Sequence, residues 1–382
     1  MQKSVIKVLH IGKFYYPYKG GIETFLHNLC SYLKEKVDVQ VLASNTHFNT
    51  IVEYVDGVKV TRAACAGVFL STPLCPSFLK YIYSSDADII HIHSPNPMAE
   101  ISFLTFASMK RLIVSYHSDI IRQRKAVFLY SPIQKRFLKR ADRIVVATPN
   151  HIKSSPLLNI FSEKCKVISY GIDLNRFKIT PNIGKIISEI TIKYRKPILL
   201  FVGRLVYYKG VEYLIKAMQK IEARLLIAGS GPEEKRLKIL ADQLGISEKC
   251  IFLGEVTEEY LISLYHASDL LVLPSVEKTE AFGIVQLEAF ACKKPVISTN
   301  LPSGVPYVNQ DGKTGFVVQP REPEALSNAI LTLLSNREMR DIMGENGRLR
   351  VENEFTVDKM GEGYLKLYKE LIESKNGTRN IS

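Results

Sequence analysis

The chain contains 382 residues, of which 46% are hydrophobic, so it is too long for one ordinary core and is expected to form two domains. Its six cysteines are scattered and no signal peptide or long apolar span is visible, which argues against a disulfide framework and favours a cytoplasmic protein. The net charge of +13 is uneven, because residues 1–170 hold 22 Lys and Arg against 11 Asp and Glu, a net +11.

Apolar runs alternate with helix-compatible segments along the first half, which predicts the α/β alternation of a doubly wound sheet. The expected strands are residues 5–11, 37–42, 58–62, 89–93, 112–116, 144–147 and 166–169. After the first strand, Gly20 and Gly21 open a crossover helix. Paired glycines there allow a phosphate or sugar to approach the backbone, and the helix N-terminus supplies partial positive charge. A flexible turn is the alternative.

Two patterns near residue 90 could hold a metal ion. Asp86 and Asp88 have the D-x-D spacing of a divalent-cation site, but they precede the strand at 89–93 and so lie opposite the ligand edge of the sheet. His91 and His93 share one strand face, as zinc ligands can, yet no Cys or carboxylate lies near them in sequence. We interpret the aspartates as solvated and expect no metal site. His93 stays a candidate to line the site of a second substrate, called the acceptor below.

His117 follows the strand at 112–116, at the edge where ligands collect, so it is the strongest acid/base candidate, with a core histidine as the alternative. Asp119 and Arg122 are candidates to meet the acceptor. The basic segment at 122–143 also carries apolar residues at helical spacing, which favours an anionic bilayer or a lipid-linked pyrophosphate. A solvated helix packed by its apolar stripe is the alternative. Nucleic acid is not expected, because no nucleic-acid motif accompanies the charge.

The second half repeats the alternation after a polar joint expected at residues 170–195, which contains Pro181 and Gly184. The expected strands are residues 198–202, 224–228, 250–253, 270–273, 296–298 and 316–318. The first of them ends in a loop with Arg204 and Lys209, at the ligand edge. Arg can fork across two phosphate oxygens and Lys adds a point charge, so both suit a diphosphate. Solvated loop cations are the alternative.

A third segment places carboxylates on either side of a helix start. Glu280 precedes the helix and Glu288 lies inside it, at most roughly 12 Å away along the helix axis. The free amides at such a helix start can hold an anion. The segment therefore suits a nucleotide-sugar, with Glu288 on the ribose and Glu280 on the hexose; two solvated glutamates are the alternative. The amides expected at the diphosphate belong to Phe282, Gly283 and Ile284.

Together these motifs resemble the retaining GT-B glycosyltransferases of family 4, also called glycosyl transferases group 1, from about residue 5 to about residue 370. The resemblance rests on Gly20-Gly21-Ile-Glu, His117-Ser-Asp, Gly171-Ile-Asp, Gly203-Arg204-Leu, Lys209-Gly210, Gly229-Ser-Gly-Pro and the pair Glu280 and Glu288. It implies two Rossmann-like domains facing a cleft that holds the active site. The implied parts are an acceptor domain (1–175), a donor domain (190–358) and a helix (359–373) crossing back to the first domain, with a disordered tail (374–382).

The resemblance also implies roles for the candidate residues. Arg204 and Lys209 would bind the donor diphosphate, Glu288 the ribose and Glu280 the transferred sugar, while Gly20 and Gly21 would close over the phosphates. His117 would meet the transferred sugar. The departing diphosphate would itself take the acceptor proton, so neither an enzymic nucleophile nor a metal cofactor is expected.

The activity predicted from the sequence is transfer of a hexose, with retention, from a nucleotide-sugar to an acceptor hydroxyl. Similarity to bacterial surface-polysaccharide mannosyl- and rhamnosyltransferases favours a GDP-mannose or GDP-deoxyhexose donor. The same similarity favours a polyprenyl-diphosphate-linked saccharide acceptor in O-antigen assembly, at the inner face of the cell membrane, where the protein would be peripherally bound. The alternatives are a UDP-sugar-dependent hexosyl or N-acetylglucosaminyl transferase, a sugar-nucleotide epimerase of the same architecture, and a non-catalytic binding protein.

Overall fold

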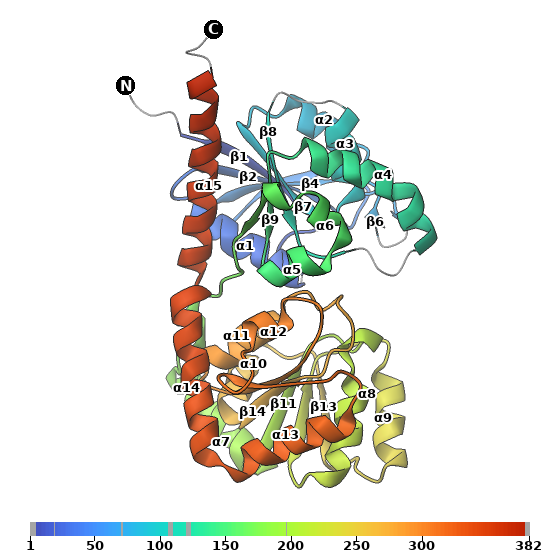
Figure 1. Ribbon diagram of the computed structural model, residues 1–382, viewed down its shortest axis with the longest axis vertical. Helices are drawn as coiled ribbons and strands as arrows, with labels where there is room; N and C mark the ends of the chain where they lie inside the picture. Colours follow the sequence, from blue (N-terminus) through green and yellow to red (C-terminus); the bar gives the residue numbers. More distant parts are fainter. Residues whose placement is uncertain are drawn as a thin grey trace. The chain divides into compact units, whose positions relative to one another are not determined.

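The computed structural model describes residues 5–18, 20–69, 72–105, 110–119, 124–195 and 197–378. The chain forms two compact units, which are Met1–Gly171 with Val357–Ser382 (unit 1) and Ile172–Thr356 (unit 2) (Figure 1). Each unit is built on its own sheet with helices against it. The predicted pair of Rossmann-like halves is therefore confirmed. None of the helices that the structure describes combines the length and the apolar character needed to cross a bilayer.

Unit 1 has a sheet in the order β10-β9-β8-β7-β1-β2-β4-β3, parallel throughout except for the β3–β4 pair. Its strands are β1 (Lys7–Ile11), β2 (Asp38–Ser44), β3 (Ile51–Val55), β4 (Val58–Ala63), β7 (Ile89–Ser94), β8 (Arg111–Tyr116), β9 (Arg143–Val146) and β10 (Cys165–Val167), with a separate hairpin of β5 (Val68–Phe69) and β6 (Thr72–Pro73). The strand order reverses between β1 and β7. Such a reversal is where ligands bind in open α/β sheets, at the carboxyl ends of the strands.

The two faces of the unit 1 sheet differ in chemistry, because successive side chains of a strand point to opposite faces. Leu9, Ile90 and Leu112 lie on the face covered by apolar residues of α2, α3 and α4. His10, His91 and Ser115 lie on the other face, together with tyrosines of α15. The helices of the unit are α1 (Gly21–Leu33), α2 (Phe78–Ser84), α3 (Pro97–Thr105), α4 (Arg124–Arg140), α5 (Pro149–Ser154), α6 (Pro156–Ile160) and α15 (Val357–Thr378), with a 3-10 turn at Ser162–Lys164.

Unit 2 has an all-parallel sheet in the order β13-β12-β11-β14-β15-β16, which reverses between β11 and β14. Its strands are β11 (Ile198–Val202), β12 (Arg224–Ala228), β13 (Cys250–Gly254), β14 (Leu270–Leu273), β15 (Val296–Thr299) and β16 (Gly315–Val318). Its helices are α7 (Pro181–Tyr194), α8 (Val211–Ala217), α9 (Glu234–Gln243), α10 (Glu258–Ala267), α11 (Ile284–Ala291), α12 (Val305–Val308), α13 (Pro323–Ser335) and α14 (Arg337–Glu354), with 3-10 turns at Leu174–Phe177, Tyr207–Lys209 and Met218–Lys220. Apolar side chains of α8, α9 and α13 form one core with the central strands.

Two expectations about chain organisation need correction, and one edge strand was missed. The expected polar joint at 170–195 contains helix α7, because Pro181 occupies its first turn and the Thr180 side chain accepts the Ile183 N–H. The antiparallel edge strand β3 was not predicted. Helix α15 continues to Thr378, so 374–378 is helical rather than a disordered tail; residues 379–382 lie outside the described part.

The end of the chain belongs to unit 1 rather than to unit 2. Helix α15 packs against α1, where a Cβ on Gly361 would lie only 2.0 Å from the ring of Tyr32. Glycine is therefore needed at 361 for this close approach. The contact brings tyrosines of the last helix against the histidine-bearing face of the first sheet.

Candidate active site

The loops after β11 and β14 meet where the strand order of unit 2 reverses. Glycines allow this contact, since a Cβ on Gly210 would lie 2.1 Å from the carbonyl oxygen of Pro274. The packing brings Lys209 and Glu280 together, with Nζ to Oε2 at 2.5 Å and side chains only 12% and 10% exposed. Ser275 Oγ also donates to Glu280 Oε2 at 2.9 Å. Two sequence candidates for donor binding thus form one buried ion pair at the expected ligand edge.

The charge state of Lys209 follows from this pairing. Burial works to lower the pKa of Lys209, but attraction to Glu280 and their hydrogen bond outweigh it, so the pKa is raised. Lys209 therefore stays cationic at neutral pH. Arg204, on the same loop, is exposed, and the structure shows no ion pair for it with the described residues. The loop offers one fixed buried cation and one guanidinium open to an incoming anion.

Helix α11 carries the second acidic candidate. Gly283, just before α11, has φ of 74°, and a Cβ there would lie 2.7 Å from Leu273 Cδ2, so glycine is needed for this turn. Glu288 is half-buried, and its Oε2 accepts the Tyr265 hydroxyl at 2.5 Å. Burial raises the pKa of Glu288, while Tyr265 and Arg176 oppose that rise. The carboxylate is held in place, and its second oxygen is suited to accept from a ligand hydroxyl.

The glycine pair of the first half opens α1 as expected, with Gly20 before the helix and Gly21 as its first residue. Glu23 lies against this start, because a Cβ on Gly20 would lie 2.1 Å from Glu23 Oε2. Burial raises the pKa of Glu23. A phosphate approaching these amides would meet that carboxylate, so donor contact at Gly20 and Gly21 requires Glu23 to move or to be protonated.

His117 follows β8, as predicted, but it is 3% exposed and both ring nitrogens have protein partners. Burial lowers the pKa of His117 to about 3. A neutral imidazole with such a pKa is a poor base at neutral pH, so the geometry does not support the acid/base role expected for His117. His93 is 2% exposed and hydrogen-bonded to His10 and His117, so its ring is engaged within the protein, and its place on the acceptor side stays a prediction.

Asp119 is hydrogen-bonded to two neighbouring side chains. Its Oδ1 accepts from the Tyr116 hydroxyl at 2.9 Å and from Ser155 Oγ at 2.7 Å. These bonds fix the carboxylate just beyond the carboxyl end of β8, the edge where ligands bind in such sheets. Arg122, the other acceptor candidate, lies outside the described residues.

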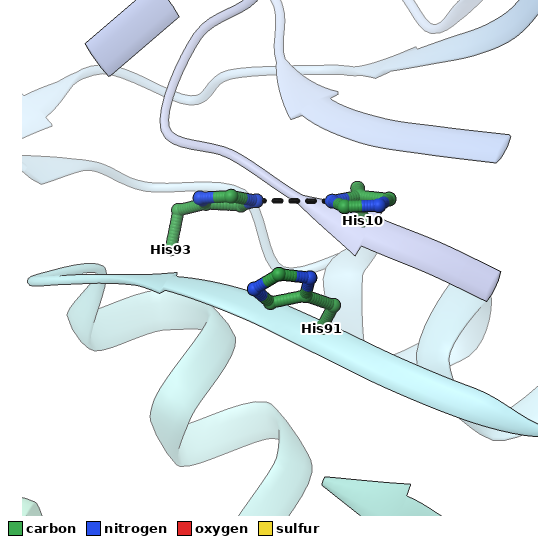
Figure 2. Close-up of side chains that lie close together, drawn as sticks. All are labelled: His10, His91 and His93. Atoms are coloured by element: carbon green, nitrogen blue, oxygen red, sulfur yellow. Dashed lines mark hydrogen bonds between the residues drawn. The ribbon is translucent and has the colours of Figure 1, made fainter. Parts of the chain in front are cut away.

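The D-x-D pair lies at the amino ends of the strands. Asp86 forms an ion pair with Lys7, and Asp88 accepts the Lys7 backbone N–H at 2.9 Å. Both aspartates therefore hold the start of β1 and stand opposite the ligand edge. Among the residues that the structure describes, one group has metal-ligand geometry, namely His10, His91 and His93 (Figure 2). No motif in the sequence indicates that His10 joins the other two.

Comparison with known proteins identifies the family. The family description "Glycosyltransferase Family 4" matches residues 19–176, and "Glycosyl transferases group 1" matches residues 182–350. O-antigen chain mannosyltransferase C of Escherichia coli is 33% identical over 381 residues, covering 97% of this chain and 100% of that one. The chain is a glycosyltransferase of this family. D-rhamnosyltransferase WbpZ of Pseudomonas aeruginosa is 34% identical, covering 98% of this chain and 99% of that one.

The fold of this glycosyltransferase is also found in solved structures. Anabaena Alr3699/HepE in complex with UDP-glucose superposes with a TM-score of 0.77, covering 97% of this chain and 100% of that one, at 20% identity. The predicted GT-B fold is thus confirmed, as is the prediction that the protein is an enzyme that transfers a hexosyl group.

Proposed function

We propose that this glycosyltransferase moves a hexose from a nucleotide-diphosphate sugar, bound by unit 2, to a hydroxyl of a lipid-linked saccharide bound by unit 1, with retention of configuration. The observation that carries the donor half is the Lys209–Glu280 pair at the strand-order reversal of unit 2. A buried cation held by a carboxylate can meet a diphosphate while the carboxylate faces the sugar. Arg204 and Glu288 extend the site toward the phosphates and the ribose.

The chemistry follows from which groups are charged. Breaking the bond between sugar and diphosphate builds negative charge on the leaving group, and Lys209 with Arg204 stabilises that charge without a metal ion. His117 is neutral and fully hydrogen-bonded, so it does not take the acceptor proton. As the resemblance to the family implies, the departing diphosphate takes the acceptor proton, and transfer occurs on one face of the sugar.

The choice of substrates rests on the relatives. An O-antigen mannosyltransferase and a D-rhamnosyltransferase match almost the whole chain, which favours GDP-mannose or a GDP-deoxyhexose as donor and a role in polysaccharide assembly. A UDP-sugar is the second candidate, because a protein of the same fold is known in complex with UDP-glucose. The acceptor we propose is a polyprenyl-diphosphate-linked saccharide.

The donor base is tested by ligand-induced thermal stabilisation with GDP, UDP, ADP, CDP and dTDP. A ligand that binds only the native state adds RT ln(1 + [L]/Kd), about 2.7 kcal/mol at 100 times Kd. We expect the largest shift with GDP. A shift in melting temperature with UDP alone would favour a UDP-sugar donor over the GDP-sugar we propose. The absence of a shift with all five nucleotides would contradict the proposed donor site.

The reaction is tested by incubating the preferred sugar nucleotide with and without a polyprenyl-diphosphate disaccharide and following the product by mass spectrometry. We expect transfer only when the acceptor is present, with the anomeric configuration of the donor. Turnover of the sugar nucleotide without acceptor would indicate an epimerase. Binding without any turnover would indicate a sugar-nucleotide-binding protein.

A membrane surface is the proposed setting of unit 1. Helix α4 exposes Lys135, Arg136 and Lys139, while Phe137 and Leu138 are buried in the core. The apolar stripe of its second half therefore packs inward, and the cations are free to meet anionic lipid. Charge reversal of these three cations should abolish sedimentation with anionic vesicles at low salt. Reversal of three exposed lysines of unit 2 (Lys185, Lys220 and Lys235) is the matched control.

A further inference from the structure

Four histidines of unit 1 join in one buried chain of hydrogen bonds. At one end, the Tyr170 hydroxyl and His117 Nδ1 lie 2.5 Å apart. His117 Nε2 then meets His93 Nδ1 at 3.0 Å. His93 Nε2 in turn meets His10 Nδ1 at 3.1 Å (Figure 2). The parallel registers produce this order, because His10 pairs with His91 across β1 and β7 while His93 pairs with Ser115 across β7 and β8.

The chain continues into the last helix and returns to the sheet. His10 Nε2 meets the Tyr368 hydroxyl at 3.2 Å, and the same hydroxyl meets His91 Nδ1 at 2.7 Å. His91 Nε2 meets Ser115 Oγ at 2.8 Å, and Ser115 Oγ meets the Tyr364 hydroxyl at 2.9 Å. Every ring nitrogen of the four histidines therefore has a protein partner. The imidazoles are at most 3% exposed, so no bulk water competes with these bonds.

A zinc site is the obvious alternative for His10, His91 and His93, whose nitrogens lie within 4.8 Å of one another. A metal would have to break bonds that these nitrogens already make. The group also contains no carboxylate or thiolate, so a divalent ion would bring an uncompensated double charge into a buried site. The geometry favours a neutral hydrogen-bonded network.

The tautomers in such a network are linked. A neutral imidazole carries one N–H, and each bond between two rings needs one proton, so each ring dictates the tautomer of the next. Along this chain each Nδ1 points toward the Tyr170 end and each Nε2 toward the Ser115 end. If Tyr368 accepted from both His10 and His91, its own buried proton would have no acceptor in the network. Two patterns satisfy every bond and also use that proton: all four rings protonated on Nε2, or all four on Nδ1. Tyr368 links His10 to His91, because its hydroxyl donates its single proton to one ring and accepts from the other.

We propose that the four histidines hold one common tautomer and that His10, His93 and Tyr368 act as positioning residues for His117. Burial lowers the pKa of His10 to about 3 and the pKa values of His91 and His93 well below their usual range, so the rings stay neutral. The network fixes the ring of His117 and thus the segment from His117 to Asp119 at the carboxyl edge of β8. The link to sugar transfer rests on the proposed function and runs through Asp119, the acceptor candidate at the end of this segment; the common tautomer does not depend on it.

The network is tested by ¹⁵N NMR of histidine-labelled protein, in which Nδ1 and Nε2 shifts report each tautomer. We expect His10, His91, His93 and His117 to be neutral and to share one pattern at pH 7.5. Two different tautomers, a protonated ring, or a stoichiometric bound metal ion in the purified protein would overturn the proposal. This measurement needs no variant and no substrate.

The positioning role is tested by Tyr368→Phe, which keeps the ring and removes the hydroxyl between His10 and His91. We expect mixed tautomers and about a tenfold lower kcat with an unchanged KM for the donor, because small misplacements at a reacting centre slow the transfer step. Tyr364→Phe is the matched control, since Tyr364 lies on the same helix and is buried, and its hydroxyl bonds Ser115 rather than a histidine. It should keep the wild-type tautomers and kcat.

The outcomes distinguish failure of the histidine network from failure of the proposed glycosyltransferase function. Unchanged tautomers in Tyr368→Phe would overturn the linkage, and altered tautomers with wild-type kcat would overturn the positioning role. If the wild-type protein transfers no sugar from any donor while its histidines share one tautomer, the proposed function fails and the network stands.

Discussion

The strand-order reversals of the two units hold opposite chemistries. In unit 1 the sheet face beside the reversal carries neutral imidazoles whose bonds all end within the protein. In unit 2 the corresponding place carries the Lys209–Glu280 ion pair beside the exposed Arg204. The same topology thus serves as a rigid polar core in one unit and as a charged binding edge in the other. Topology therefore sets where a site lies, while side-chain charge sets what it binds.

The largest expected difference between the two units is in acid stability, because low pH should destabilise unit 1 much more than unit 2. The four histidines have folded pKa values below the unfolded value of about 6.5, so the unfolded state binds more protons as pH falls. Their contribution to stability is complete well above pH 6.5 and is lost as pH falls below it. For His10 and His117, whose folded pKa values are about 3, the loss is about 2 kcal/mol each at pH 5. Unit 2 holds one histidine, His266, whose pKa is also lowered.

Hydrogen exchange measured separately for each unit at pH 7.5 and pH 5 checks this expectation. Amides of β1, β7 and β8 should lose much more protection than those of β11, β12 and β14. Equal loss in both sheets would mean that the histidine network does not control the acid stability of unit 1.

Replacing Lys209, the buried cation of unit 2, should have the next largest effect, on both stability and kcat. Lys209→Met leaves Glu280 buried without its partner, which should destabilise unit 2 by about 3–5 kcal/mol and lower kcat by at least a hundredfold. The double variant Lys209→Met, Glu280→Gln should recover much of the stability, as measured by urea unfolding, but none of the transfer activity. Recovery of activity in the double variant would exclude Lys209 from leaving-group stabilisation.

Glu288→Ala should weaken binding of the nucleoside diphosphate by roughly tenfold, because the ribose loses a charged hydrogen-bond acceptor. Isothermal titration calorimetry measures the change. Tyr265→Phe is the control, since it removes the hydroxyl bound to Glu288 and leaves the carboxylate. Unchanged affinity in Glu288→Ala would remove Glu288 from the donor site.

The smallest effect is expected for Arg204→Lys. The exposed guanidinium has no ion pair to lose among the described residues, so stability should change by less than about 0.5 kcal/mol. A lysine cannot fork across two phosphate oxygens, so donor affinity should fall a few-fold. A kinetic titration with donor measures this change, and wild-type affinity would show that the fork is not used.

The sequence predicted most strands because buried parallel strands are continuous apolar runs, as at Ile198–Val202 and Leu270–Leu273. It predicted α7 poorly, because Pro181 and Gly184 are typical of a loop and only the cap at Thr180 shows that the proline begins a helix. The edge strand β3 was missed because it pairs through one neighbour and its side chains are mostly exposed.

The candidate site could also be predicted only in part from the sequence. Lys209, Glu280 and Glu288 could be named because glycines and charged residues follow strand ends, which the sequence shows directly. Their pairing could not be named, since it depends on the contact between the loops after β11 and β14. The burial of His93 and His117 was likewise hidden, because exposure depends on what covers a strand face.

The α/β alternation, the uneven charge and the residues that follow each strand can be read from the chain alone, because they depend on neighbours in sequence. Packing in three dimensions joins His10 to His93 across 83 residues and brings Tyr368 of the last helix to both His10 and His91. Strand order and register set these contacts, and they arise from packing of segments far apart in the chain. Such packing also decides which polar groups are buried and therefore which can carry charge.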